Sequence, residues 1–308
     1  MRRRTPFLAL VAAAACGGAG AATDRVSVMA LDRLSGELSA HDVELPGADA
    51  ALVRGPAGIV LVGATLDGTR IAGGAAPDCA LRRKATGALV ARTGPCVALL
   101  GEYAAMERGR QFLLSAGAEA LPPAPVLADS TAPGLHYLPA ADAFTLGDGP
   151  RGARVPAAFN PGAVAREMAR RQLRTVSESH PQLAEGVALF LGAAASADPG
   201  YLASSEPGGD PAGQLDLGRP LPDDAPASAV LAGALWAWAD ASGDLTGAAR
   251  AALAAARALN PGSPADAAAR DPAVLLSLVS DQLVGAEHDQ ACAVFRARLR
   301  ASHLAACP

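Results

Sequence analysis

The sequence predicts an α+β fold in which a small N-terminal all-β domain precedes a mostly α-helical domain. Short β-like stretches separated by glycine and proline turns fill the first third of the chain, and helical periodicity fills the second half. A segment rich in proline and small residues lies between them. The chain has 308 residues, of which 51% are hydrophobic, so it can bury a sizeable core, and its length favours two domains.

The N-terminus has the composition of an export signal. Three arginines precede the apolar run Phe7–Ala15, which is too short to span a bilayer, and Cys16 and a run of small residues follow. Cleavage before Cys16 would leave a lipid-bearing cysteine, whereas cleavage within Ala19–Ala21 would give a periplasmic or secreted protein. We expect residues 1–22 to be signal peptide and flexible tether, and the protein to be a lipoprotein of the bacterial envelope, anchored to the membrane at Cys16.

The cysteine count favours lipidation. Five cysteines are an odd number for an exported protein, and setting Cys16 aside leaves two local pairs. We expect disulfides Cys79–Cys96 and Cys292–Cys307. Each closes a short loop in an oxidising compartment and stabilises the fold by about 3 kcal/mol in the chain-entropy model.

The charge balance argues against nucleic acid as a partner. Residues 1–15 carry three of the 26 basic residues and none of the 30 acidic ones, so the formal charge falls from −4 to −7 on processing. Lys84 is the only lysine, which indicates a coding bias towards arginine more than a binding surface.

Residues 23–118 are expected to form the β domain, as a sandwich or barrel. Its strand-like stretches are RVSVMAL, GELSAHDVEL, AALVRGPAGIVLVGA, GTRIAG, GALVART and CVALLGEY. The Cys79–Cys96 disulfide would pin one hairpin or loop of this domain. His41 is isolated within it, and an isolated histidine in a strand-rich domain is more often a surface or structural residue than a metal ligand.

Residues 119–134 are expected to form a linker or an extended crossover. From 135 to 308 the periodicity predicts a mostly helical domain, punctuated by Asn-Pro-Gly and Asp-Pro-Gly stretches. The expected helices are Ala163–Val176, Gln182–Ala197, Ser228–Ala241, Thr246–Leu259, Asp271–Val284 and Asp289–His303. The chain has no phosphate-binding loop and no Gly-x-Ser-x-Gly nucleophile elbow, which excludes those enzyme classes.

The first of these helices has charged residues at the spacing of a known zinc-binding motif. Arg166, Glu167 and Arg170 occupy the positions of a His-Glu-x-x-His zinc helix, in which residues at i and i+4 share a face and the glutamate activates water. Arginine stands where both histidines would be. Arg-Glu-x-x-Arg alone arises easily on any charged helix, so the argument depends on the downstream sequence.

The stretch AEGVALFLGAAASADP, at 184–199, resembles the second zinc helix of thermolysin-like and fungalysin-like metallopeptidases, the gluzincins. In that family a glutamate on this helix is the third zinc ligand, and an aspartate four residues on orients a histidine. Glu185 stands at the ligand position and Leu189 at the aspartate position. The resemblance therefore implies a second helix packed beside the first.

Further stretches resemble the same family in the same order. QLDLGRPLPDDAPASAVLAGALWAWAD, at 214–240, is similar to a segment that runs through a catalytic histidine into a Gly-Ala-Leu-Trp helix, but Ala227 and its neighbours leave no histidine there. GLHYLPAADAF and FNP, at 134–144 and 159–161, occupy the place of the strands and turn before the zinc helix. The resemblance covers about residues 125–260 and does not include the β domain.

The side-chain chemistry predicts that zinc has been lost and that the protein has no cofactor. A guanidinium has five donors, no acceptor and a pKa too high for deprotonation, so Arg166 and Arg170 cannot replace histidines. Glu185 would be the one familiar ligand, whereas a catalytic zinc takes three from the protein. The histidines, at 41, 136, 180, 288 and 303, form no pair at i and i+4.

An ion-pair cluster would replace the metal. The arginines at 166, 170 and 174 are expected along one helical stripe, where Glu185 of the neighbouring helix satisfies one of them. Structural ion pairing is the preferred interpretation of this cluster. The alternative is an arginine-lined cleft that binds a peptide C-terminus, a protein ligand or another anion.

The leading functional hypothesis is a noncatalytic, exported lipoprotein with a degenerate gluzincin-like domain, acting by binding or as a structural part of the envelope. The alternative is a hydrolase with a relocated, metal-free carboxylate site, drawn from Glu167, Glu185, Asp216, Asp223 and Asp224. A third interpretation is that the resemblance is accidental and the second half is a plain helical domain. Helices that bring Glu167 and Glu185 across from one another would argue against the third.

Overall fold

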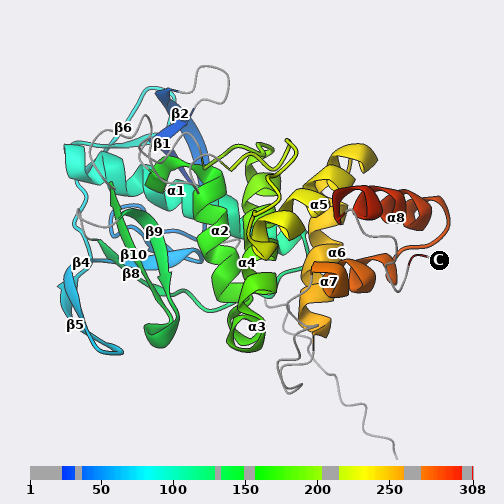
Figure 1. The fold of residues 1–308 in the computed structure, drawn as a ribbon. Coiled ribbons are helices and arrows are strands. Elements are labelled where there is room, and N and C mark those ends of the chain that lie inside the picture. The colour runs from blue at the N-terminus through cyan, green and yellow to red at the C-terminus, as the bar shows by residue number, and fades with distance from the viewer. Residues whose placement is uncertain are drawn as a thin grey trace, which may run out of the picture.

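The computed structural model describes residues 23–31, 37–128, 133–148, 157–202, 215–259, 272–299 and 307 (Figure 1). The expected signal peptide and the lipidation site at Cys16 lie outside these residues. Strands gather towards one end of the molecule and helices towards the other, so the fold is α+β, as the sequence predicts. None of the described helices has the length and apolar character that a bilayer crossing requires.

The first sheet is built around β1 (Thr23–Leu31). Its order is β2-β1-β7-β6, with β2 at Leu38–Pro46, β6 at Leu81–Arg83 and β7 at Leu89–Ala91. β1 runs antiparallel to β2 along its whole length, from Thr23 opposite Pro46 to Leu31 opposite Leu38, and parallel to β7. Val26 and Val28 of β1 are buried, which places one face of this sheet on the core.

The second sheet crosses the segment that the sequence predicts to be a linker. Its order is β3-β4-β8-β10-β9, with β5 paired to β4. The strands are β3 (Arg54–Gly55), β4 (Gly58–Asp67), β5 (Arg70–Ala75), β8 (Pro125–Ala128), β9 (Pro133–Leu138) and β10 (Ala143–Asp148). β8 lies within the predicted linker 119–134 and runs parallel to both β4 and β10. The expectation of a linker was therefore wrong for this stretch.

A long helix, α1 (Gly94–Ser115), corrects the all-β prediction for the N-terminal part. The stretch CVALLGEY, expected as a strand, forms its first turns, because Pro95 suits a helix start and the sequence that follows is rich in helix formers. At Gly101 a Cβ atom would lie 2.6 Å from the carbonyl oxygen of Met29, so glycine lets α1 lie close against β1. The predicted Cys79–Cys96 disulfide is formed and ties the first turn of α1 to the chain before β6.

Each stretch of the second half that the sequence predicts to be helical contains a helix, although α7 ends at Ser280, before the predicted Val284, and predicted residues 300–303 lie outside the described residues. The observed helices are α2 (Pro161–Gln172), α3 (Arg174–Ser179), α4 (Pro181–Ser196), α5 (Ala227–Ser242), α6 (Leu245–Ala258), α7 (Pro272–Ser280) and α8 (Ala286–Leu299). The expected helix 163–176 is divided at Leu173, so its last residues belong to α3. Two short 3-10 helices, Pro139–Ala141 and Ala157–Phe159, follow β9 and precede α2.

Helix α4 forms the centre of the helical part and packs between α2 and α5. It is apolar almost all round, which is typical of a buried helix. Glycines allow both contacts: a Cβ on Gly192 would lie 2.7 Å from the carbonyl oxygen of Gly162 on α2, and one on Gly186 would lie 2.8 Å from that of Ser228 on α5. The α2–α4 contact therefore brings the two helix backbones unusually close.

Helix α8 closes the far end of the molecule. The ring of Phe295 meets that of Trp238 on α5 edge to face, with centroids 5.8 Å apart. The predicted Cys292–Cys307 disulfide is formed and ties the end of the chain to α8. Two disulfides are compatible with an exported protein in an oxidising compartment.

Candidate functional site

The candidate site starts at the N-terminus of α2. The side-chain oxygen of Asn160 accepts hydrogen bonds from the backbone N–H groups of Gly162 and Ala163, at 3.0 and 3.3 Å, and Pro161 begins the helix. The Asn160 amide nitrogen donates to the carbonyl oxygen of Tyr201, at 2.5 Å. This cap fixes where α2 begins and therefore which of its residues face α4.

Arg166 and Arg170 both bind Glu185 of α4. The Nε atom of Arg166 lies 2.9 Å from Oε1 of Glu185, and the Nε atom of Arg170 lies 2.8 Å from Oε2. The Nη2 atom of Arg170 also lies 2.8 Å from Oε2. Glu185, which is expected from the sequence to satisfy one arginine, satisfies two.

Glu167 completes the group, which we call the Glu185 cluster: Arg166, Glu167, Arg170 and Glu185. Nη1 of Arg170 lies 2.7 Å from Oε1 of Glu167, so Arg170 bridges the two carboxylates. The other oxygen of Glu167 accepts the backbone N–H of Tyr137 at 3.0 Å and lies 3.6 Å from Nδ1 of His136 on β9. Glu167 is 5% exposed and its oxygens are engaged by Arg170 and β9.

The formal charges of the two arginines and two glutamates of the Glu185 cluster balance, and the charged form of Arg166 is favoured. Burial alone would lower the pKa of Arg166, but attraction to Glu185, and to Tyr201 and Glu167, outweighs burial and raises it. Tyr201 is buried next to the cluster, and burial raises the pKa of its hydroxyl.

Arg174 does not join the stripe that the sequence predicts. Because the helix breaks at Leu173, Arg174 points towards Asp142, and its Nη1 atom lies 4.0 Å from Oδ1 of that residue. The stripe thus consists of Arg166 and Arg170, because the helix does not continue straight to Val176.

A cleft of about 770 Å³ borders the cluster. Arg166, Glu185 and Leu189 form part of one wall, with Leu189 one turn after Glu185 on α4. The other lining residues are mostly leucine, proline and alanine, together with Asp216, Arg219, Asp224 and Ser228. Arg170 and Arg174 are not among the lining residues, and most of the lining is apolar. Ala227, the first residue of α5, lies beside this cleft.

Within the described part of the chain, no three or more His, Cys, Asp or Glu side chains are grouped so that they could hold a metal ion. Of the histidines, His136 lies next to Glu167, His180 is buried at the start of α4, and His41 and His288 lie on β2 and α8. His303 is outside the described residues. The contact of His136 with Glu167 is not evident in the sequence, because it joins a strand to a helix 31 residues later.

A second ion-pair group on α2 was missed by sequence reasoning. Arg171 donates to both carboxylate oxygens of Asp142, each at 2.8 Å, and to the carbonyl oxygen of Pro122, also at 2.8 Å. The hydrogen bond from Arg171 lowers the pKa of Asp142. Burial, and then the nearby charge of Asp142, raises the pKa of Tyr137 to about 12.

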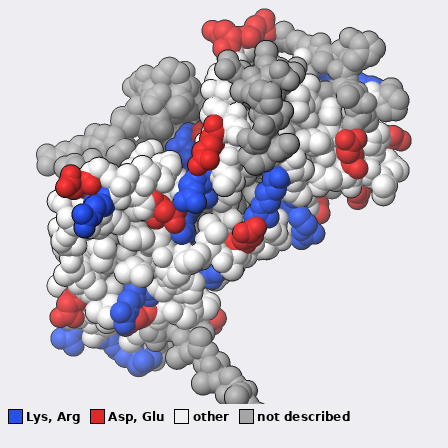
Figure 2. All heavy atoms as spheres, turned by 90° about the horizontal axis from the view of Figure 1, so that it is seen from below, with Lys and Arg blue, Asp and Glu red and all other residues white. Residues whose placement is uncertain are grey.

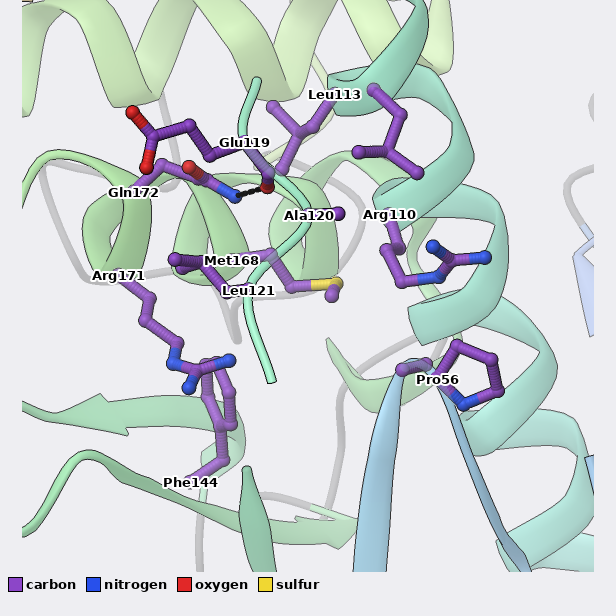
Figure 3. A pocket seen from close by; sticks show the side chains of 12 residues that line it. Pro56, Arg110, Leu113, Glu119, Ala120, Leu121, Phe144, Met168, Arg171 and Gln172 are labelled. Atoms are coloured by element: carbon purple, nitrogen blue, oxygen red, sulfur yellow. Dashed lines mark hydrogen bonds between the residues drawn. The ribbon is translucent and has the colours of Figure 1, made fainter. Parts of the chain in front are cut away.

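Arg171 also borders a small cavity of about 30 Å³, enough for a water molecule (Figure 3). Met168 and Gln172 of α2 and Leu113 of α1 line it, and the segment Glu119–Leu121 passes across it. The Gln172 side-chain nitrogen donates to the Glu119 carbonyl oxygen at 2.8 Å. These contacts hold the segment before β8 against α2.

No protein-family model matches the chain, and no curated protein matches it.

Proposed function

We propose that this protein is a noncatalytic, exported lipoprotein whose second half is a degenerate gluzincin-like domain, and that it acts in the cell envelope by binding or as a structural part. The observation that carries the proposal is the Glu185 cluster. The two arginines at the frame positions of zinc-binding histidines point at the glutamate in the position of the third ligand, and their donors lie 2.8–2.9 Å from its oxygens.

The placement of the four residues supports this proposal over an accidental resemblance. A chance Arg-Glu-x-x-Arg helix gives no reason for a glutamate 15 residues later to meet both arginines. The strands β9 and β10 before the helix, and the packed pair α2 and α4, are also what the resemblance implies. Guanidinium groups fill the position that a dication would need, and they repel it.

The cluster favours structural ion pairing over anion capture. Arg166 and Arg170 already donate to carboxylates, and their side chains are only 19% and 28% exposed. A ligand carboxylate would have to displace Glu185. If the protein binds a peptide or protein ligand, we therefore expect it to bind in the apolar cleft beside the cluster and not at the arginines themselves.

The proposal is tested on purified wild-type protein exposed to zinc and assayed with an unstructured protein substrate. We expect no zinc at the cluster and no peptidase activity that depends on Glu167. One equivalent of zinc, together with cleavage abolished by Glu167→Gln, would overturn it. Glu107→Gln is the matched control, because Glu107 is equally buried and pairs with Arg110 at the same i, i+3 spacing, away from the cleft.

The lipid anchor has its own test. Lipidation at Cys16 predicts that the wild-type protein fractionates with membranes and incorporates labelled fatty acid, whereas Cys16→Ser is released. Equal fractionation and equal labelling of the two would contradict the anchor and favour a periplasmic or secreted protein.

A metal-free hydrolase is the second candidate, because Asp216 and Asp224 line the same cleft as Glu185. Against it, Glu185 and Glu167 are neutralised by arginine. Hydrolysis that survives chelation and is lost in Asp216→Asn or Asp224→Asn would support this candidate and overturn the noncatalytic proposal.

A further inference from the structure

The two disulfides of this protein form a matched pair. They join cysteines 17 and 15 residues apart, with Cα–Cα distances of 5.6 and 5.5 Å. Their burial is also similar: Cys79 and Cys96 are 2% and 7% exposed, and Cys292 and Cys307 are 5% and 3% exposed. Loop length and access therefore give little reason for one to be reduced before the other.

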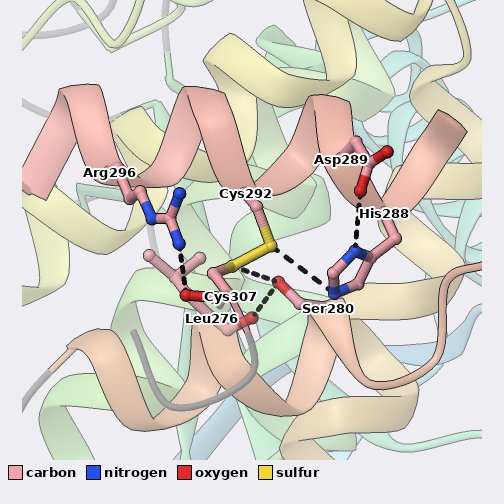
Figure 4. Close-up of a disulfide and its surroundings, with 7 residues drawn as sticks. All are labelled: Leu276, Ser280, His288, Asp289, Cys292, Arg296 and Cys307. Atoms are coloured by element: carbon pink, nitrogen blue, oxygen red, sulfur yellow. Dashed lines mark hydrogen bonds and ion pairs between the residues drawn. A yellow bond between two sulfur atoms is a disulfide. The ribbon is translucent and has the colours of Figure 1, made fainter. Parts of the chain in front are cut away.

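Their surroundings differ (Figure 4). The Nε2 atom of His288 lies 3.6 Å from the sulfur of Cys292, one turn along α8, and its Nδ1 atom lies 3.3 Å from a carboxylate oxygen of Asp289. The hydroxyl of Ser280 on α7 lies 3.7 Å from the sulfur of Cys307. Among the described residues, no side-chain nitrogen bonds to either sulfur of the Cys79–Cys96 disulfide.

We propose that Cys292–Cys307 is a redox-exchangeable disulfide in which His288 stabilises Cys292 as the leaving thiolate. A thiolate that departs next to an imidazolium has a lowered pKa and leaves faster, and its reduced form is favoured at equilibrium. Asp289 accepts from the other ring nitrogen, which orients the ring with Nε2 towards the sulfur. The Cys79–Cys96 disulfide lacks this arrangement and is the structural one.

The reaction is a thiol–disulfide exchange with a dithiol reductant. One thiolate of the reductant attacks the sulfur of Cys307, the Cys292–Cys307 bond breaks, and its electron pair goes to Cys292. The second thiol of the reductant then attacks the mixed disulfide and releases Cys307. The reductant is oxidised to its disulfide by loss of two electrons. One of its two protons ends on Cys307, and the other ends on Cys292 or, while Cys292 stays a thiolate beside the imidazolium, in solvent.

The structure also favours reversal of this step. Arg296 donates to the carbonyl group of Cys307, and Ser280 contacts its sulfur, so contacts other than the disulfide hold Cys307 beside α8. Two thiols kept close together re-form their bond readily when an oxidant is present. Reduction therefore removes the covalent link between Cys307 and α8 but leaves the two cysteines close together.

The test measures how fast each disulfide of the same molecule is reduced. The oxidised wild-type protein is treated with dithiothreitol under native conditions, thiols are trapped by alkylation at successive times, and the two pairs are quantified by peptide mass spectrometry. We expect Cys292–Cys307 to be reduced on the order of tenfold faster than Cys79–Cys96. Equal rates for the two disulfides would overturn the proposal.

Variants at His288 separate its charge from its bulk. His288→Ala and His288→Gln should each slow reduction of Cys292–Cys307 towards the rate of Cys79–Cys96, since glutamine keeps a donor but cannot carry the charge. The Cys79–Cys96 rate and the melting temperature of the oxidised protein should stay unchanged. An unchanged Cys292–Cys307 rate in both His288 variants would overturn the role of His288.

Discussion

Helix α2 carries two arginine–carboxylate groups that look alike and differ in what surrounds them. Arg171 binds Asp142, a turn residue whose side chain is 40% exposed, and braces a loop. Arg166 and Arg170 bind Glu185, whose side chain is 23% exposed, and Arg170 also holds the buried Glu167. The Arg171 pair shows that α2 forms such contacts without any lost metal site, so an ion pair alone is no evidence of one.

What distinguishes the Glu185 cluster is its position. It joins α2 to α4 and forms part of the wall of a cleft. Elsewhere the charges are mixed: Figure 2 shows basic and acidic side chains in small groups of both signs over one face, separated by uncharged surface. Burial and placement therefore separate the Glu185 cluster from the ordinary ion pairs of the surface.

The largest effect is expected from Glu185→Ala. It leaves Arg166 and Arg170 without their shared carboxylate and should lower the free energy of unfolding by about 2–3 kcal/mol, less than for a fully buried pair because both arginines retain some exposure. Urea denaturation measures this change. Because Arg170 also pairs with the buried Glu167, replacing Arg166 and Arg170 by Met together with Glu167→Gln and Glu185→Leu should restore most of it; a loss below about 0.5 kcal/mol in Glu185→Ala would place the cluster with the surface pairs.

The crossing of α2 and α4 should be nearly as sensitive. In Gly192→Ala the new methyl group meets backbone, 2.7 Å from the carbonyl oxygen of Gly162, so the helices must move apart. We expect a loss of roughly 1–3 kcal/mol in the free energy of unfolding. Gly243→Ala is an unsuitable control because its φ is 70°, whereas Gly94→Ala meets nothing within 4 Å and should stay near wild type.

The smallest effect is expected at the ion pair of Arg171 with Asp142, the more exposed of the two groups on α2. Asp142→Asn should lower the free energy of unfolding by about 0.5–1 kcal/mol at neutral pH. Arg171 lowers the pKa of Asp142 in the folded protein, so this contribution is present above the ordinary aspartate pKa near 4 and is lost as the pH falls through the lower folded value. Wild type and variant should therefore converge in acid; a difference that grows below pH 4 would contradict the assignment.

The sequence predicted the parts of this molecule that depend on local pattern. The helices of the second half follow from periodicity and Asn-Pro-Gly punctuation, whereas the meeting of Glu185 with an arginine was expected only from the family resemblance. The helix at Gly94–Ser115 was missed because its first residues also fit a strand. The strand Pro125–Ala128 was missed because the prolines before and within it indicate a linker. Its pairing with β4 and β10 depends on long-range contacts that the local sequence does not show.

The contacts that sequence reasoning could not reach are tertiary. Asp142 meets Arg171 because it lies in a left-handed turn after β9, and neither residue carries a motif. His136 meets Glu167 through the packing of β9 on α2. Each of these contacts can be identified only once the fold is known.

The most direct test of the central claim is to return histidine to the cluster. Arg166→His combined with Arg170→His removes both guanidinium groups and, with Glu185, supplies the three ligands of a catalytic zinc site. The account predicts about one equivalent of bound zinc in the folded double variant at micromolar zinc, none in wild type, and loss of the metal when Glu185→Gln is added. A folded double variant that binds no zinc, or wild-type protein that binds zinc at Glu185, would contradict it.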